Sequence, residues 1–193
     1  VAAAAMAAAA TVQSTLGGFP TLLKGIRTYK LEPAKMGGTA SKADERLLRS
    51  GANFASWYRW YFETQRTTLE SEFYDSIRGS FPGFKSLEPV QAGSAQELLA
   101  RFSVGGVSVD YLFDELSDGQ RQLLCLYLLN ISLRPGEVLF LDEPDNYLSI
   151  REVQPWLSEL DDAADTRNAQ ALIVSHGTEA MDYLASRRAW FLS

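Results

Sequence analysis

The pattern of hydrophobic and polar residues is clearest in the second half of the chain. Two continuous apolar runs, Val138–Leu141 and Ala171–Val174, are typical of strands that are buried on both faces. Apolar residues at helical spacing fill the segments around these runs. From residue 117 onward, we predict helices at 117–132, about 150–164 and 178–186, and strands at 137–142, 170–175 and 188–192. Strands that alternate with helices indicate an α/β fold with a parallel sheet covered by helices on both faces.

The segment from residue 53 to residue 65 is predicted to be a helix with an aromatic face. Its aromatic residues recur at the i, i+3, i+4 and i+7 spacing of one helix face: Phe54, Trp57, Tyr58, Tyr61 and Phe62. Such a stripe can stack on nucleic-acid bases, but packing into a core is the commoner use, and we interpret the stripe as core. A second helix is predicted from Thr68 to Arg78, where Thr67 and Glu70 have the spacing of a capping box.

Two β-rich runs, Leu98–Val104 and Val107–Phe113, flank a Gly105-Gly106 pair. Glycine adopts positive φ angles without steric cost, so this pair predicts a tight hairpin turn. The two helices and the hairpin together form a helical and hairpin insertion before the helix at 117–132.

Composition excludes several classes of protein. A net charge of -6 and a pI near 4.9 argue against strong non-specific binding of nucleic acid. The single cysteine, Cys125, excludes an internal disulfide and indicates an intracellular, cytoplasmic protein. No apolar run approaches the roughly 20 residues that cross a bilayer, so no membrane insertion is expected. Basic residues do gather near the N-terminus, where we interpret them as a solvated face: Lys24, Arg27, Lys30 and Lys35.

The chain divides into three expected segments. Residues 1–10 hold eight alanines and have neither the charge nor the leucine-rich stretch of a signal peptide, so we interpret them as placeholder residues or an artefact. Residues 11–95 are expected to combine the remnant of an N-terminal lobe with the helical insertion. Residues 96–193 are expected to form a C-terminal lobe.

The first candidate site opens the long apolar helix at residues 116–120, Leu-Ser-Asp-Gly-Gln. Ser117 and Gln120 have the spacing of a capping box, which is a purely structural role. The free N–H groups and the dipole of a helix N-terminus also attract phosphate, and Gly119 would let such a ligand come close. Both interpretations remain open for this segment.

The second candidate site is the pair Asp142-Glu143, which follows a buried strand. Ligands of open α/β sheets bind beyond the carboxyl ends of the strands. An aspartate at that position can hold Mg²⁺, and the next glutamate can deprotonate an attacking water. His176, the only histidine of the chain, follows the next buried strand and is expected near the same site. The alternatives are a solvated acidic turn and a structural histidine.

The order and spacing of these motifs resemble a known superfamily. LSDGQ (116–120), VLFLDEP (138–144) and IVSH (173–176) are similar to the signature motif, Walker B motif and switch histidine of ATP-binding-cassette ATPases. IRTYKLEP (26–33), SGANFASW (50–57) and FPGF (81–84) resemble a narrower group, the RecF- and SMC-like ATPases of the AAA family. The likeness covers most of residues 20–193 and implies a P-loop NTPase-like parallel sheet.

The resemblance also implies roles for individual residues. Ser117 and Gly119, with Gln120 beside them, would bind the γ-phosphate of ATP held by a partner protomer. Asp142 would serve Mg²⁺, Glu143 would be the catalytic base, and His176 would contact the γ-phosphate. Asp145 and Asn146, in the loop that follows Walker B (the D-loop, residues 145–149), would lie at the seam of a homodimer.

One motif of the superfamily, the phosphate-binding loop G-x-x-x-x-G-K-[ST], does not occur in the sequence. We expect it in an N-terminal lobe that would precede residue 20. The Q-loop glutamine is expected in the same lobe.

The resemblance favours ATP binding and hydrolysis by a dimerising ATPase that serves DNA maintenance or antiphage defence, with DNA or a nuclease or toxin as further partner. Two alternatives remain. One is the nucleotide-binding subunit of a membrane transporter, which the aromatic helix and the hairpin fit less well. The other is an ATP-gated, non-catalytic scaffold for a nuclease or toxin, against which the presence of Glu143 argues.

Overall fold

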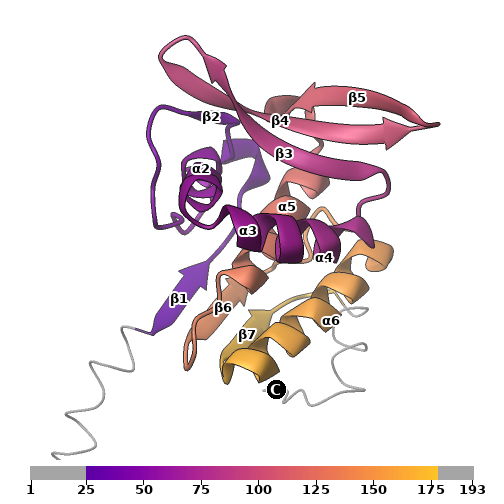
Figure 1. Cartoon of the computed structure of the whole chain (residues 1–193). Coiled ribbons are helices and arrows are strands. Elements are labelled where there is room, and N and C mark those ends of the chain that lie inside the picture. The colour runs from indigo at the N-terminus through magenta and orange to yellow at the C-terminus, as the bar shows by residue number, and fades with distance from the viewer. Residues whose placement is uncertain (1–24, 178–193) are drawn as a thin grey trace, which may run out of the picture.

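The computed structural model describes residues 25–177, which form two β-sheets with helices between them (Figure 1). In chain order, the elements are β1 (Ile26–Tyr29), η1 (Pro33–Lys35), β2 (Thr39–Ala40), α2 (Phe54–Thr64), α3 (Arg66–Thr68), the π-helix η2 (Leu69–Phe73), α4 (Tyr74–Arg78), β3 (Phe84–Ala92), β4 (Ala95–Val104), β5 (Val107–Leu112), η3 (Phe113–Glu115), α5 (Asp118–Ile131), β6 (Val138–Asp142), α6 (Ile150–Arg167) and β7 (Gln170–Val174). The alanine tract, Lys24, and the helix and strand predicted at 178–186 and 188–192 lie outside the described residues.

The first sheet is parallel and has the strand order β1-β6-β7. Tyr29 is paired with Leu141, and Asp142 is paired with Val174, so the three strands end at nearly the same level. Helix α6 connects β6 to β7, as expected for a strand–helix–strand unit in a parallel sheet. The prediction of an α/β fold with a parallel sheet is confirmed.

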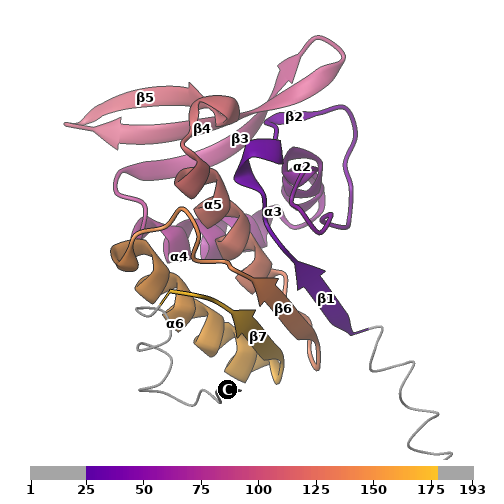
Figure 2. The ribbon, with the colours of Figure 1, turned by 180° about the vertical axis from the view of Figure 1, so that it is seen from behind.

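Helices cover one face of this sheet within residues 25–177 (Figure 2). Leu139 and Leu141 are buried on that face, and Ala171 and Ile173 pack against the same core. On the opposite face, Leu172 is 51% exposed and Val174 43% exposed. The prediction of strands buried on both faces therefore does not hold within residues 25–177, because α5 and α6 lie on the same side of the sheet.

Helix α5 is the centre of the fold. Every residue from Gln122 to Asn130 is buried, which is the behaviour of a helix surrounded by protein on all sides. It packs against α6, the π-helix η2 and α4. Polar groups on it are satisfied inside the core: the Trp156 indole N–H donates to Asn130 Oδ1 at 3.1 Å, and the Tyr127 and Ser80 hydroxyls lie 2.6 Å apart.

The second sheet is antiparallel and lies at one end of the molecule (Figure 1). The predicted hairpin is confirmed, since β4 and β5 pair across Gly105 and Gly106, which both have positive φ. Strand β3, which also pairs with β4, was not predicted. It contains Pro89, which has no N–H for a ladder, and β3 tolerates it because it is an edge strand. The boundary expected after residue 95 falls at the first residue of β4.

The helical part of the insertion supplies the core between the two sheets. Phe54, Trp57 and Tyr58 are at most 2% exposed, so the interpretation of the aromatic stripe as core is confirmed. The capping box predicted for Thr67 is wrong. The helix already begins at Arg66, and a single residue separates it from the end of α2. The Thr67 carbonyl accepts a hydrogen bond from the Ser71 hydroxyl at 2.8 Å. Between residues 25 and 177, no helix combines the length and apolar character that a bilayer span requires.

Candidate functional site

Three strand ends bring the candidate residues together at one edge of the parallel sheet (Figure 2). Lys30 follows β1, Asp142 ends β6 and is followed by Glu143, and Ser175 and His176 follow β7. The Glu143 N–H donates to the Val174 carbonyl at 2.7 Å, which keeps the second and third strand ends in register. The carboxyl edge of a parallel sheet is where open α/β folds bind ligands.

Asp142 faces a lysine of the neighbouring strand. The Lys30 ammonium donates to Asp142 Oδ2 at 3.0 Å and lies 3.7 Å from Glu143 Oε2. The hydrogen bond from Lys30 to the Asp142 carboxylate is the main cause that raises the pKa of this lysine above its ordinary value. Lys30 therefore places a positive charge between the two carboxylates that end β6.

Lys30, which we interpreted from the sequence as part of a solvated basic face, belongs to the candidate site. Its side chain is half exposed, but it has two acidic partners in the candidate site. The strand that precedes it, β1, was not predicted, and the only signal in the sequence was that Lys30 lies in the segment IRTYKLEP, which carries the family resemblance. Arg27 is also no surface residue: its guanidinium bonds to Ser132 Oγ at 2.9 Å and to Glu137 at 2.8 Å beside the sheet.

Glu143 has a backbone conformation that is rare for a residue with a side chain. Its φ is +51°, in the left-handed region, which costs of order 1–3 kcal/mol for residues other than glycine. Such strain is found mainly at functional positions. The Asn146 amide donates to Glu143 Oε2 at 3.1 Å, and His176 Nε2 lies 3.4 Å from Glu143 Oε1. The two residues predicted to be catalytic, Glu143 and His176, are thus direct neighbours.

His176 stands at the rim of the site. Its side chain is 87% exposed, whereas the Glu143 side chain is 27% exposed. The D-loop residue Asp145, predicted at the dimer seam, turns its carboxylate toward the same strand end: Ser175 Oγ donates to Asp145 Oδ2 at 2.7 Å. Asn146 and Asp145 therefore contact Glu143 and the histidine loop within this chain.

The signature segment begins α5 and has the predicted capping box. The Gln120 N–H donates to Ser117 Oγ at 3.3 Å, and the Ser117 N–H donates to Gln120 Oε1 at 3.0 Å. A Cβ on Gly119 would lie 2.5 Å from the Tyr147 carbonyl oxygen, so this glycine lets the D-loop approach the helix. The structural interpretation of these residues is confirmed, and binding of a phosphate by them stays a prediction.

Helix α5, which the signature segment begins, is connected to the turn after β6, next to the strand-end cluster of Lys30, Asp142, Glu143 and His176. Gln122 donates from Nε2 to the Pro144 carbonyl at 2.6 Å. Within residues 25–177, no hydrogen bond or ion pair joins the side chains of Ser117 or Gln120 to Asp142, Glu143 or His176. The predicted site residues consequently form two groups: a cluster at the strand ends, and a separate helix N-terminus.

The donors in the strand-end cluster suit Mg²⁺ only as part of a nucleotide complex. Among residues 25–177, no group of three or more His, Cys, Asp and Glu side chains is placed to hold a metal ion. Mg²⁺ is usually bound by one or two carboxylates, with substrate phosphates and water filling the other positions. The pair Asp142 and Glu143 meets that requirement.

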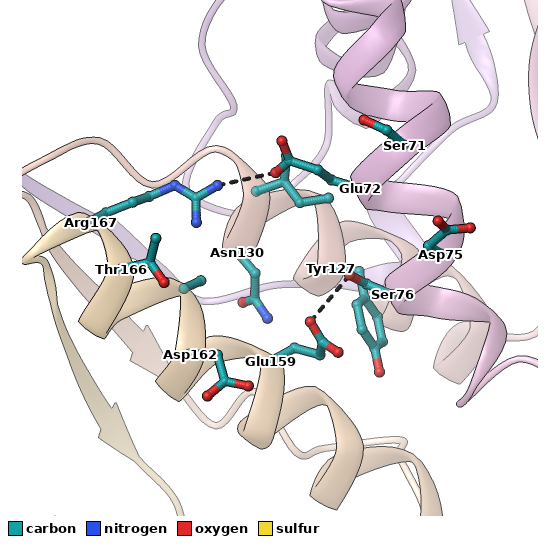
Figure 3. Close-up of a pocket in the computed structure, with 12 residues that line it drawn as sticks. Ser71, Glu72, Asp75, Ser76, Tyr127, Asn130, Glu159, Asp162, Thr166 and Arg167 are labelled. Carbon is teal, nitrogen blue, oxygen red and sulfur yellow. Dashed lines mark hydrogen bonds and ion pairs between the residues drawn. The ribbon is translucent and has the colours of Figure 1, made fainter.

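A cavity of about 320 Å³ lies elsewhere, between the helical insertion and helices α5 and α6 (Figure 3). Four of the side chains that line it are acidic: Glu72, Asp75, Glu159 and Asp162. Arg167 pairs with Glu72 at 3.3 Å, and Ser76 donates to Glu159 at 3.2 Å. The predicted site residues are not among those that line it, so the hollow and the strand-end cluster are different places.

The solved structures to which this chain is similar include two SMC proteins. One comes from work on ATP-driven dimerization and DNA-stimulated activation of SMC ATPases, with 14% identity, a TM-score of 0.48, and coverage of 65% of this chain and 76% of that chain. The other is an SMC head bound to the C-terminal winged-helix domain of ScpA, with 15% identity, a TM-score of 0.49, and coverage of 65% and 39%. None of the curated proteins matches the chain significantly.

A protein-family model matches residues 39–182, which is more than half of the chain. The family is described as "AAA domain, putative AbiEii toxin, Type IV TA system". The match spans the insertion, the signature helix, both carboxylates and the histidine loop. The chain therefore belongs to this AAA-domain family.

Proposed function

We propose that this chain carries the catalytic groups of an ATPase that hydrolyses ATP with Mg²⁺ in the cytoplasm. The observation that carries the proposal is the contact between Glu143 and His176 beside Asp142. A carboxylate and an imidazole next to a potential metal ligand are the groups needed to activate a water and to stabilise charge on a phosphate.

The proposal gives each residue of the cluster a separate task. Asp142 would hold Mg²⁺, which supplies charge neutralisation at the phosphates when it is bound. Glu143 accepts a proton from the attacking water, and Asn146 holds its Oε2 atom in place through a hydrogen bond of 3.1 Å. His176, which is largely exposed, donates to the γ-phosphate of a nucleotide that approaches the sheet edge from outside.

We further propose that the active form is a homodimer with composite sites. The side chain of Ser117 makes no hydrogen bond to the strand-end cluster of its own chain within residues 25–177. A second copy would bring its helix N-terminus, with Ser117, Gly119 and Gln120, to the γ-phosphate held at this sheet edge. The dipole and free N–H groups of that helix suit an anion. Asp145 and Asn146 lie in the D-loop between the two groups and would approach the dimer seam.

The cellular role proposed for the ATPase is defence or DNA maintenance. The family description refers to a toxin of a type IV toxin–antitoxin system, and this supports a role in defence. A nuclease, a toxin partner or DNA would then be the component on which the ATP-driven dimer acts.

The test is Glu143→Gln in the full-length protein. Replacing a carboxylate by an amide of the same shape removes the base, so we expect the rate of ATP hydrolysis to fall roughly 100-fold or more. ATP binding should persist, and a stable ATP-bound dimer should appear in multi-angle light scattering. Glu70→Gln, on the exposed face of the insertion, is the matched control and should hydrolyse ATP at the wild-type rate. Unchanged hydrolysis by Glu143→Gln would refute the assignment of the base.

The composite site is tested by Ser117→Arg. A long cation at the helix N-terminus should block closure and abolish ATP-dependent dimers. Ser117→Asn keeps an N-capping side chain and controls for loss of the helix cap. If Ser117→Arg still forms ATP-dependent dimers in the Glu143→Gln background, Ser117 does not act on the partner's nucleotide.

A further inference from the structure

The loops on both sides of the catalytic cluster are tied together by one carboxylate. Asp145 lies in the D-loop after β6, and Ser175 lies in the loop after β7. The Ser175 hydroxyl donates to Asp145 Oδ2 at 2.7 Å. The same hydroxyl oxygen accepts a hydrogen bond from the Gly177 N–H at 2.9 Å. A chain of two hydrogen bonds thus runs from Gly177 through Ser175 to Asp145, and its two loop residues flank His176.

The position of Gly177 shows how closely the carboxylate covers this loop. A Cβ built on Gly177 would overlap Asp145 Oδ2 and would lie 3.3 Å from Ser175 Oγ. A side chain at position 177 would therefore require the Asp145 carboxylate to move. Asp145 thus lies close to the histidine loop on both sides of His176, at Ser175 and at Gly177.

The second oxygen of this carboxylate adds an independent observation. Asp145 Oδ1 is buried and has no hydrogen-bond partner within residues 25–177. A buried acceptor without a partner costs of order 1–3 kcal/mol, more when it is charged. Such a cost is tolerated mainly where the placement of the group serves a function. A carboxylate kept only to stabilise the fold would not be placed in this way.

His176 itself has little that fixes its position. Its side chain is 87% exposed, so packing does not hold the imidazole, and its distance of 3.4 Å from Glu143 Oε1 depends on the backbone of the loop. Two hydrogen bonds hold that backbone on the two sides of the histidine. The Gly177 N–H donates to the Ser175 hydroxyl, and the Ser175 hydroxyl donates to Asp145.

We propose that Asp145 is the positioning residue of the switch histidine. Through Ser175 and Gly177 it fixes the loop so that His176 stays beside Glu143, and it makes the D-loop and the histidine loop move as one unit. The proposal rests on the proposed function, in which His176 and Glu143 act on ATP. It adds that a shift of the D-loop, for instance when a second copy docks, changes the geometry of the histidine in the same chain.

The test uses the fact that His176 is the only histidine of the chain. In protein labelled with ¹³C,¹⁵N-histidine, the imidazole Hε1–Cε1 resonance belongs to this one residue and reports its environment without any nucleotide. We expect Ser175→Ala and Asp145→Ala to move or broaden this resonance toward the random-coil position. Ser175→Thr, which keeps a hydroxyl, should restore it. Ser76→Ala removes another partly buried serine–carboxylate bond, to Glu159, and should leave it unchanged.

The second part of the test measures the kinetics of ATP hydrolysis by the same variants of the full-length protein. Since a misplaced catalytic group lowers turnover more than binding, we expect kcat to fall roughly 10- to 100-fold with little change in KM for ATP. An unchanged His176 resonance in folded Ser175→Ala protein overturns the proposal, as does a shifted resonance with unchanged kcat. If the wild-type protein does not hydrolyse ATP, the proposed function fails, while the resonance alone still decides whether Asp145 positions the histidine.

Discussion

The ammonium of Lys30 lies 3.0 Å from Asp142 Oδ2, although the two residues, at the ends of neighbouring strands, are 112 positions apart in the chain. Lys30 also lies 3.7 Å from Glu143, so a single cation pairs with both carboxylates at the end of β6. Because like charges repel, a cation close to both carboxylates is favourable at this position. Lys30 supplies that charge from the edge strand β1.

This relationship predicts that Lys30 competes with the divalent cation for Asp142. Lys30→Met should strengthen the apparent affinity for Mn²⁺, measured by EPR with full-length protein and a non-hydrolysable ATP analogue. We expect a gain of roughly two- to fivefold, the range that exposed ion pairs provide. Lys35→Met removes an ammonium that pairs with Glu32 at 2.6 Å on the surface and should not change the affinity. Weaker Mn²⁺ binding by Lys30→Met would contradict competition and would indicate that the lysine helps to hold the nucleotide.

The second prediction separates the packing role of Gly119 from ligand binding. In Gly119→Ala, the new methyl group would lie 2.5 Å from the Tyr147 carbonyl oxygen, so the D-loop must shift. We expect a loss of about 1–3 kcal/mol in the free energy of unfolding, measured by urea denaturation without nucleotide. Gly79→Ala is the matched control, because Gly79 ends α4 with a φ of −64° and has open space around it. That control should be neutral or slightly stabilising. Equal stability of both variants would show that Gly119 serves a ligand or partner and not the D-loop.

The third prediction concerns the packing contact between the helical insertion and the antiparallel sheet. The Tyr58 hydroxyl is buried, donates to the Leu87 carbonyl at 2.5 Å and lies 2.9 Å from the Tyr74 hydroxyl. Burial raises the pKa of Tyr58 well above its ordinary value, so the phenol stays a donor throughout the physiological range. Tyr58→Phe should cost about 1–2 kcal/mol of unfolding free energy in urea denaturation, because it removes this donor from a buried network.

Tyr111→Phe provides the comparison for that experiment. Its ring is 40% exposed on β5, and removal of an exposed hydroxyl usually changes stability by less than about 0.5 kcal/mol. If Tyr58→Phe were as stable as Tyr111→Phe, the aromatic stripe of α2 would not depend on its buried hydroxyl, and its assignment as core would rest on the rings alone.

Sequence reasoning predicted most elements of the fold because their signals are local. Helix α5, strands β6 and β7 and the hairpin turn at Gly105-Gly106 all lie where hydrophobic period, caps and glycines indicated. Strand β3 was missed because Pro89 and charged residues interrupt its pattern, and only its place at the sheet edge explains why it tolerates them. The helix that begins at Arg66 follows soon after the end of α2, so its start depends on where α2 ends. No local capping pattern indicated that start.

For the site, the sequence by itself determined which groups are available: the carboxylates of Asp142 and Glu143, the lone imidazole of His176, and the capping pair Ser117 and Gln120. Residue type and distance from a strand or helix end are properties of the chain alone.

Only the tertiary structure decided which of these groups meet. The register of the parallel sheet brings Lys30 to Asp142 and His176 to Glu143, and the turn after β6 carries Asp145 to Ser175. Such contacts depend on strand order, on the left-handed backbone at Glu143 and on the space left by Gly177. They join residues from about 30 to more than 100 positions apart, and no local pattern encodes a distance through space between segments so far apart.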